Sequence, residues 1–128
     1  MATKHLDARG KGEIDYDYKE DTLFFKIKDR EYMNSLDFEG LVVDIDKEGF
    51  LTGIQIFDAS QLFGIPKEAL RNTKFMEFSA KAQEKEVILR FRFIAALRNK
   101  SFMQQGQDII REATAPLAST EMMCTMKA

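Results

Sequence analysis

The chain has 128 residues, a length typical of one domain. It carries 19 basic and 21 acidic residues, so it lacks the basic excess of nucleic-acid-binding domains and has no general attraction to anionic membranes. The single cysteine, Cys124, excludes an intrachain disulfide. Together with a polar N-terminus and no apolar run of about 20 residues, it predicts a cytoplasmic protein.

The N-terminal third of the chain predicts a flexible end followed by a hairpin. Residues 1–13 are polar and contain two glycines, which indicates a flexible N-terminus before a single domain over residues 14–128. Apolar residues then alternate with polar ones on both sides of the polar break at 19–21, which predicts two antiparallel strands with one buried face. The alternating residues are Ile14, Tyr16 and Tyr18 before the break and Leu23, Phe25 and Ile27 after it.

A second hairpin follows in residues 41–57. Leu41, Val43 and Ile45 alternate with polar or smaller residues, and the pattern returns from residue 50 after a turn that contains Gly49. Gly53 within the returning strand predicts a bulge or a close approach of another backbone.

Residues 58–72 predict one or two short helices. Asp58 followed three residues later by Gln61 has the form of a capping box, and Gly64 is expected to end this first helix. Pro66 suits the first position of a second helix, and Asn72 is a plausible end.

The C-terminal half predicts further strands. Residues 74–80 alternate, residues 82–85 form a polar turn, and residues 87–98 alternate again, although their spacing also fits a helix. We favour a strand, because two arginines alternate with four large apolar residues. Residues 99–100 indicate a turn, 101–107 alternate weakly, and 108–114 fit either a helix or a strand before Pro116. Residues 121–128 fit an edge strand or a loose tail. The fold class is therefore mainly β, an antiparallel sheet of hairpins with short helices around residues 58–72.

The acidic residues Asp44, Asp46 and Asp58, with Glu48, are the first candidates for chemistry. If they converged, their carboxylates could hold a divalent cation such as Ca²⁺ and support a metal-dependent enzyme or a metal-binding protein. Their spacing is not that of an EF-hand loop. A solvated strand face that runs into a polar turn explains them better.

A possible basic patch includes Arg90 and Arg92 and suggests nucleic-acid binding as a second alternative. Alternation turns Phe91 and Phe93 away from these arginines, whereas RNA-binding sheets expose aromatics on the binding face. We favour cross-strand pairing with a glutamate as the role of the arginines. The other basic residues considered are Arg71, Lys74, Arg98 and Lys100, and the candidate partners are Glu77, Glu84 and Glu86.

The usual catalytic motifs are absent from the sequence. His5 is the only histidine, so a histidine-based metal cluster is excluded and a histidine-centred catalytic triad is not expected. Cys124 has no basic neighbour that would activate it, which favours a small buried or edge thiol. No glycine-rich phosphate-binding motif is present, and no cofactor is expected.

Three ordered motifs carry a resemblance to a family of unknown function, DUF2283. Members typically read Y-D-x-x-x-D-x-L-Y-I, then G-V-I-V-D-x-D-x-x-G, then I-V-G-I-E-I-L-D-A-S. The matching stretches here are residues 16–25, 40–49 and 51–60, with Phe24 in place of the usual Tyr and Gln55 in place of the usual Glu. The hairpins of residues 14–60 thus resemble the family, and residues 61–128 are expected to be an extension packed on the same core.

The resemblance brings no established activity. The segment 62–70 is similar to an extension of archaeal relatives, which implies an archaeal source. The resemblance to small members of the family implies binding to small toxin-like proteins. The leading hypothesis is therefore a non-catalytic protein-binding or structural module. Because open sheet edges need protection, we expect a homodimer or a complex with another protein.

Overall fold

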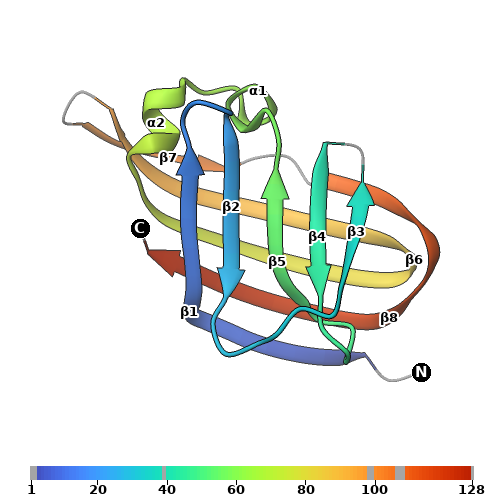
Figure 1. Ribbon diagram of the computed structural model, residues 1–128. Coiled ribbons are helices and arrows are strands. Elements are labelled where there is room, and N and C mark those ends of the chain that lie inside the picture. Colours follow the sequence, from blue (N-terminus) through green and yellow to red (C-terminus); the bar gives the residue numbers. More distant parts are fainter. Residues whose placement is uncertain (1–2, 39, 98–99, 106–108, 128) are drawn as a thin grey trace.

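In the described part of the chain, eight strands join into one hydrogen-bonded sheet that folds over on itself (Figure 1). The computed structural model describes residues 3–38, 40–97, 100–105 and 109–127. The prediction of a mainly β, mostly antiparallel fold with two short helices is confirmed. The elements are β1 (Lys4–Asp17), β2 (Thr22–Ile27), β3 (Asn34–Phe38), β4 (Leu41–Ile45), β5 (Leu51–Ile56), α1 (Ala59–Phe63), α2 (Lys67–Arg71), β6 (Thr73–Leu97), β7 (Lys100–Gln105) and β8 (Ile109–Lys127).

The sheet forms two layers whose strands cross steeply, and β1 belongs to both (Figure 1). The strand order is β3-β4-β5-β2-β1-β8-β6-β7. The C-terminal half of β1 pairs antiparallel with β2, whereas its N-terminal half pairs parallel with β8. The register shifts between Ala8 and Gly12, where β1 passes from one layer to the other. Bulges and glycines are the usual means of such a bend.

The prediction of a flexible N-terminus is wrong for residues 4–13, which form the first half of β1. The prediction of an edge strand or loose tail after residue 121 is also wrong, because this part of β8 lies between β1 and β6. The two errors have one cause. Residues 4–8 and 120–124 pair with each other, as in Lys4↔Thr120 and Ala8↔Cys124. A local sequence pattern cannot reveal a pairing partner so far along the chain.

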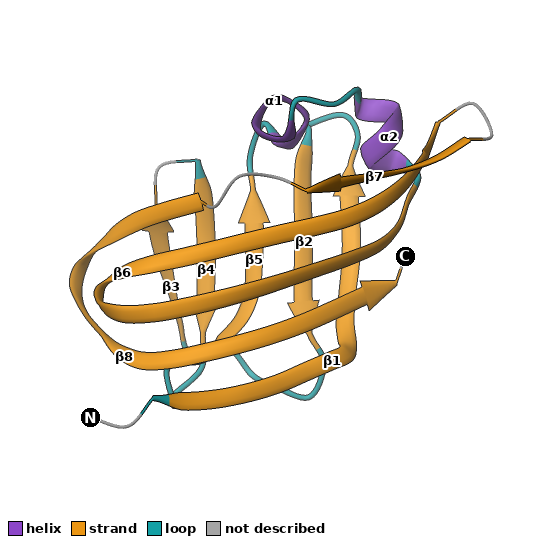
Figure 2. Cartoon of the chain, turned by 180° about the vertical axis from the view of Figure 1, so that it is seen from behind, coloured by secondary structure: helices purple, strands orange, loops and turns teal. Residues whose placement is uncertain are grey.

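Strand β6 reverses direction within its length (Figure 2). Arg92 Nη2 lies 3.1 Å from Glu77 Oε1, although a straight strand would separate residues 15 positions apart by about 50 Å. The rings of Phe78 and Phe91 likewise have centroids 6.0 Å apart. Register shifts against β8 fall at residues 82–86, where the sequence predicts a turn. The strand prediction for 87–97 is confirmed, and the helical alternative is wrong.

Strand β8 follows both arms of β6. Its first residues, 109–112, pair with residues 86–89, and its last residues, 120–127, pair with residues 75–82. Pro116 lies where the pairing jumps from Glu112 to Leu117, so its missing N–H interrupts no ladder bond there. The strand alternative for 108–114 is thus confirmed from residue 109. The predicted turn at 99–100 includes residue 99, which lies outside the described residues.

The two helices begin and end close to the predicted residues. Gly64 (φ 67°) ends α1 and Asn72 ends α2, as predicted, and Pro66 lies one residue before α2. The predicted capping box is wrong: Asp58 precedes α1 in a left-handed conformation, and its side chain makes no capping hydrogen bond. The first N–H groups of α1 are instead bound by Asp21, a residue of the β1–β2 turn.

Phenylalanine rings fill much of the space between the layers. The rings of Phe25 and Phe78 have centroids 4.1 Å apart, and Phe63 of α1 packs edge-on against Phe91 and Phe93. The buried apolar residues form one cluster that runs from Ala8 to Met126. Residues 14–60 and the described part of 61–127 therefore share one core.

Candidate functional site

The family-like motifs meet at Asp21, in the turn between β1 and β2. Its carboxylate accepts a hydrogen bond from the hydroxyl of Tyr16 (2.5 Å) and two from Ser60, through the backbone N–H (3.1 Å) and the hydroxyl (2.7 Å). Its carbonyl oxygen accepts the N–H of Ala59. Asp21 thus joins the first hairpin to the start of α1, 39 residues further along the chain.

The ionisation of this cluster fits a structural role. Burial of Asp21 favours its neutral form, but hydrogen bonds from Tyr16 and Ser60 outweigh burial and hold the pKa of Asp21 below its ordinary value. Burial, with the adjacent Asp21 carboxylate, raises the pKa of Tyr16. Both groups keep their ordinary charge states near neutral pH, so neither is prepared to donate or accept a proton there.

Asp46 holds the turn between β4 and β5 in a similar way. Its carboxylate accepts the backbone N–H groups of Glu48 (2.9 Å) and Phe50 (3.1 Å) and pairs with the guanidinium of Arg30. Arg30 also lies over the ring of Phe50, 4.9 Å from its centroid. Asp46 is 8% exposed, so the prediction of a solvated carboxylate does not hold at this position.

The structure does not bring Asp44, Asp46 and Asp58 together. Ile45, the last residue of β4, pairs with Leu51 at the start of β5, so Asp46 lies near the start of β5. Asp58 follows the end of β5, about 20 Å away along that strand. Asp44 lies on the outer face of β4 and accepts a hydrogen bond from the hydroxyl of Ser35 (2.6 Å). Within the described residues, no group of three or more acidic, histidine or cysteine side chains could hold a metal ion.

Arg90 and Arg92 lie on the outer face of the second layer. Arg92 pairs with Glu77, one of the glutamates that the sequence suggests as its partner. Arg90 lines a hollow of about 500 Å³ on the same face, beside Lys81, Glu121 and Met123. Glu121 pairs with both His5 (Nδ1 to Oε2, 3.0 Å) and Lys81 (Nζ to Oε1, 3.6 Å).

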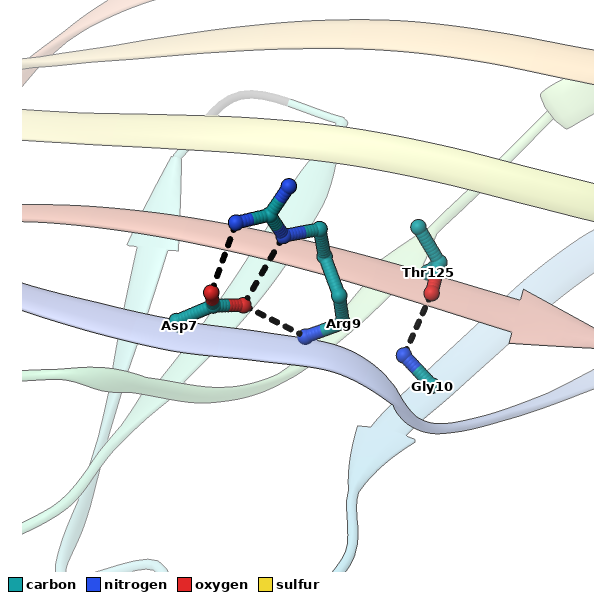
Figure 3. Close-up of polar contacts among 4 residues, drawn as sticks. All are labelled: Asp7, Arg9, Gly10 and Thr125. Carbon is teal, nitrogen blue, oxygen red and sulfur yellow. Dashed lines mark hydrogen bonds and ion pairs between the residues drawn. The ribbon is translucent and has the colours of Figure 1, made fainter.

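The strand β1 adds a further charge pair to this face (Figure 3). Arg9 donates to Asp7 through its Nη2 (2.7 Å), its Nε (3.0 Å) and its backbone N–H (3.2 Å). These hydrogen bonds lower the pKa of Asp7 to about 2. Nearby, the N–H of Gly10 donates to the hydroxyl of Thr125 and ties β1 to β8. Among the described residues of this face, Arg9, Lys81 and Arg92 are thus each paired with a carboxylate.

The lone cysteine is structural in its setting. Cys124 is fully buried in β8 between the layers, and burial raises the pKa of its thiol to about 11. The prediction of a small buried thiol is confirmed.

A different surface stands out at the open edge of the first layer. Tyr32 and Met33 directly precede the terminal strand β3, and their exposed fractions, 65% and 71%, are the highest among the described large apolar side chains. The N–H of Met33 donates to the carbonyl of Ile45, which fixes this segment beside β4. Tyr32 lines two hollows, one of about 620 Å³ over the outer face and one of about 600 Å³ beside the β4–β5 turn.

Sequence reasoning missed both groups of residues. It used Tyr16, Asp21 and Ser60 only as parts of motifs, and a pairing across 39 residues has no local signal. Tyr32 and Met33 lie outside the regular alternation, next to the charged break at 29–31. An aromatic residue and a methionine in a polar connection are the signal that would have drawn attention to this edge.

Comparisons with known proteins agree with the motif resemblance. Residues 13–60 match the model of a family described as "Protein of unknown function (DUF2283)". A protein of Methanosarcina mazei, named "Putative hypoxanthine phosphoribosyltransferase", is 33% identical over 96 residues, which cover 75% of this chain and 77% of that protein. An uncharacterized protein of Methanocaldococcus jannaschii is 29% identical over 97 residues, which cover 75% of this chain and 84% of that protein.

No solved structure gives a significant match. In the part of the chain that the structure describes, no helix is long and apolar enough to cross a membrane. The motifs of residues 16–60 build the turns and the polar cluster described above, and the similarity to the M. mazei protein extends over three quarters of the chain. The protein therefore belongs to the DUF2283 family of proteins of unknown function.

Proposed function

We propose that the protein is a non-catalytic protein-binding module and that its binding surface is the open edge of the first layer. The observation that carries this proposal is the pair Tyr32 and Met33, strongly exposed beside the terminal strand β3. Tyrosine and methionine are enriched in protein interfaces, because they bury a large apolar area. An edge strand adds unpaired backbone groups that a partner can bind.

The setting of the polar residues supports binding rather than catalysis. Asp21 and Asp46 are engaged in hydrogen bonds that hold turns in place. Asp44 and Asp46 stand apart from Asp58, so the three carboxylates do not form one site. A general acid or base needs a pKa near the working pH, and the shifts of Asp21 and Tyr16 move both groups further from neutrality.

We further propose that the partner is either a second copy of this chain or another protein, met in the cytoplasm of an archaeal cell. The two relatives from M. mazei and M. jannaschii support the archaeal source. The buried, unpaired Cys124 is compatible with a reducing compartment.

Paired substitutions of exposed apolar residues test the proposal. We expect Tyr32→Ser with Met33→Ser to abolish self-association, measured by light scattering over a concentration series, or to abolish retention of a protein captured from native lysate. The control is Leu62→Ser with Met123→Ser, residues of α1 and β8 that are 42% and 43% exposed. Equal association and capture by both double variants, or a wild-type protein that is monomeric and captures nothing, would contradict the proposal.

The name of the M. mazei relative concerns phosphoribosyl transfer, and we do not propose that activity for this chain. The phosphates of a phosphoribosyl donor need clustered N–H donors, as at a glycine-rich loop or the start of a long helix. The sequence has no such glycine motif, and α1 and α2 have five residues each. We expect no diphosphate release with hypoxanthine and phosphoribosyl diphosphate. Enzyme-dependent release would refute the non-catalytic proposal.

A further inference from the structure

Strand β3 is an edge that lacks several of the usual protections, although its backbone approaches β8. It is five residues long, stands at one end of the strand order, and pairs only with β4 among the described strands. Its residues, NSLDF, include no proline and no lysine, and its pairing with β4 has no bulge. Proline, lysine and bulges are devices by which natural edge strands resist the addition of another strand. Figure 1 shows β3 at the rim of the first layer.

The charge around this edge is strongly acidic, although the whole chain is nearly neutral. The described residues between 29 and 48 include six acidic and only two basic side chains. One of the two, Arg30, is already paired with Asp46. On β3 itself Asp37 is exposed, and Asp44 lies on the neighbouring strand, opposite Ser35. A strand added at β3 would therefore meet carboxylates on the outer face of the sheet.

Apolar side chains lie on the opposite face of β3 and directly before the strand. Leu36 is half-buried against the core, and Tyr32 and Met33 are exposed at the start of the strand. An added strand alternates its side chains between the two faces of the sheet. The side chains that fit this edge are therefore basic on one face and apolar on the other.

We propose that β3 accepts an extended segment of a partner protein, with alternating basic and apolar residues, as an additional strand of the sheet. This inference rests on the proposed protein-binding function and names the mode of binding and the chemistry of the partner. Backbone hydrogen bonds to β3 supply affinity, and Asp37, Tyr32 and Met33 supply selectivity, as in other cases of strand addition. The five residues of β3 offer about 17 Å of edge.

Synthetic peptides test the proposal directly. The probe is a capped, fluorescent peptide of alternating lysine and valine, about 10 residues long. We expect saturable binding by anisotropy that weakens with added salt, with amide shift changes in two-dimensional NMR centred on residues 34–38. A glutamate–valine peptide should not bind. A lysine–valine peptide that is N-methylated at alternate residues keeps its charge but cannot complete the ladder, and it should also fail to bind.

A charge reversal at the edge provides the matched variant. Asp37→Lys should weaken binding of the lysine–valine peptide about tenfold, because an attraction becomes a repulsion. Glu86→Lys makes the same change at an exposed position of β6 and should leave binding unchanged. Equal loss in both variants, equal binding of the N-methylated peptide, or shift changes away from β3 would overturn the proposal.

The outcome is separable from that of the general function. If no peptide binds while Tyr32→Ser with Met33→Ser still abolishes association, protein binding stands and the added basic strand is refuted. If the protein forms a dimer in which β3 pairs with β3 of a second copy, the basic partner is likewise refuted.

Discussion

Tyr16 donates its phenolic hydrogen bond to Asp21, whose carboxylate in turn accepts the N–H and the hydroxyl of Ser60 at the start of α1. One buried carboxylate therefore closes the β1–β2 turn and caps a helix from another part of the chain. In this protein the most recognisable motif residues stabilise the fold. The surface that we propose for binding lies elsewhere, at the edge around Tyr32 and β3.

Removal of the Tyr16 hydroxyl should destabilise the protein. We expect Tyr16→Phe to lower the free energy of unfolding by about 1.5–3 kcal/mol, because it removes a hydrogen bond to a charged, buried acceptor. Urea denaturation gives the value. Tyr18→Phe is the control, since its hydroxyl makes a longer, exposed bond to Glu68 (3.2 Å) and should cost much less. Equal costs at the two tyrosines would show that the Asp21 cluster is not a stabilising unit.

The lowered pKa of Asp21 predicts the direction of a pH effect. Its folded-state pKa lies below the unfolded value, so the ionised carboxylate contributes stability that is present above the unfolded pKa of about 3.9. That stability is lost as the pH falls through the folded-state pKa. The stability difference between the wild type and Asp21→Asn, from urea midpoints, should therefore be largest near neutral pH and shrink below about pH 4. A difference that stays constant down to pH 2 would be inconsistent with this ionisation.

Gly12 has no room for a side chain at the bend of β1. A Cβ at this position would lie 2.1 Å from Met126 Cγ and 2.9 Å from Cys124 Sγ, both of them buried. We expect Gly12→Ala to cost about 1–3 kcal/mol through overpacking. Adding Met126→Ala opens the space, so the double variant should be more stable than the sum of the single effects predicts. Thermal and urea unfolding measure this coupling, and strict additivity would argue against direct contact.

The separation of the acidic residues predicts no response to divalent cations. Asp44, Asp46 and Asp58 do not form one site, and Asp46 is already satisfied by Arg30 and two N–H groups. Ca²⁺, Mg²⁺ or Mn²⁺ at millimolar concentration should leave the melting temperature unchanged. A cation-specific rise that Asp44→Asn removes would restore the metal hypothesis.

The sequence predicted the parts of the fold that local patterns determine. The hairpins β1–β2 and β4–β5 and the reversal of β6 each join neighbouring segments, so alternation and turn residues suffice to find them. Gly53 was expected at a bulge or a close approach. The register does shift between Asp44 and Ile45, and the carbonyl of Phe25 lies 3.1 Å from where a Cβ of Gly53 would be.

Long-range pairing escaped prediction. The parallel ladder between β1 and β8 joins residues such as Leu6 and Met122, which orders both ends of the chain without any local signal. Asp58 has the sequence form of a helix cap, but its backbone is left-handed and its side chain makes no capping hydrogen bond. Asp21 accepts the N–H of Ser60 in α1 instead. The candidate site was missed for a related reason, because the exposure of Tyr32 depends on where the sheet ends.

Cys124 offers a probe of the central strand β8. The thiolate is the reactive form, and burial raises the pKa of this thiol to about 11, so almost none is ionised at pH 7.5. We expect a maleimide or an aromatic disulfide reagent to react very slowly with the folded protein and rapidly in urea. Gly12→Ala, which disturbs the contact with Cys124 Sγ, should accelerate the reaction, whereas Glu86→Lys should not. Fast labelling of the wild type at low urea would show that the seam between β1 and β8 opens readily in the native state.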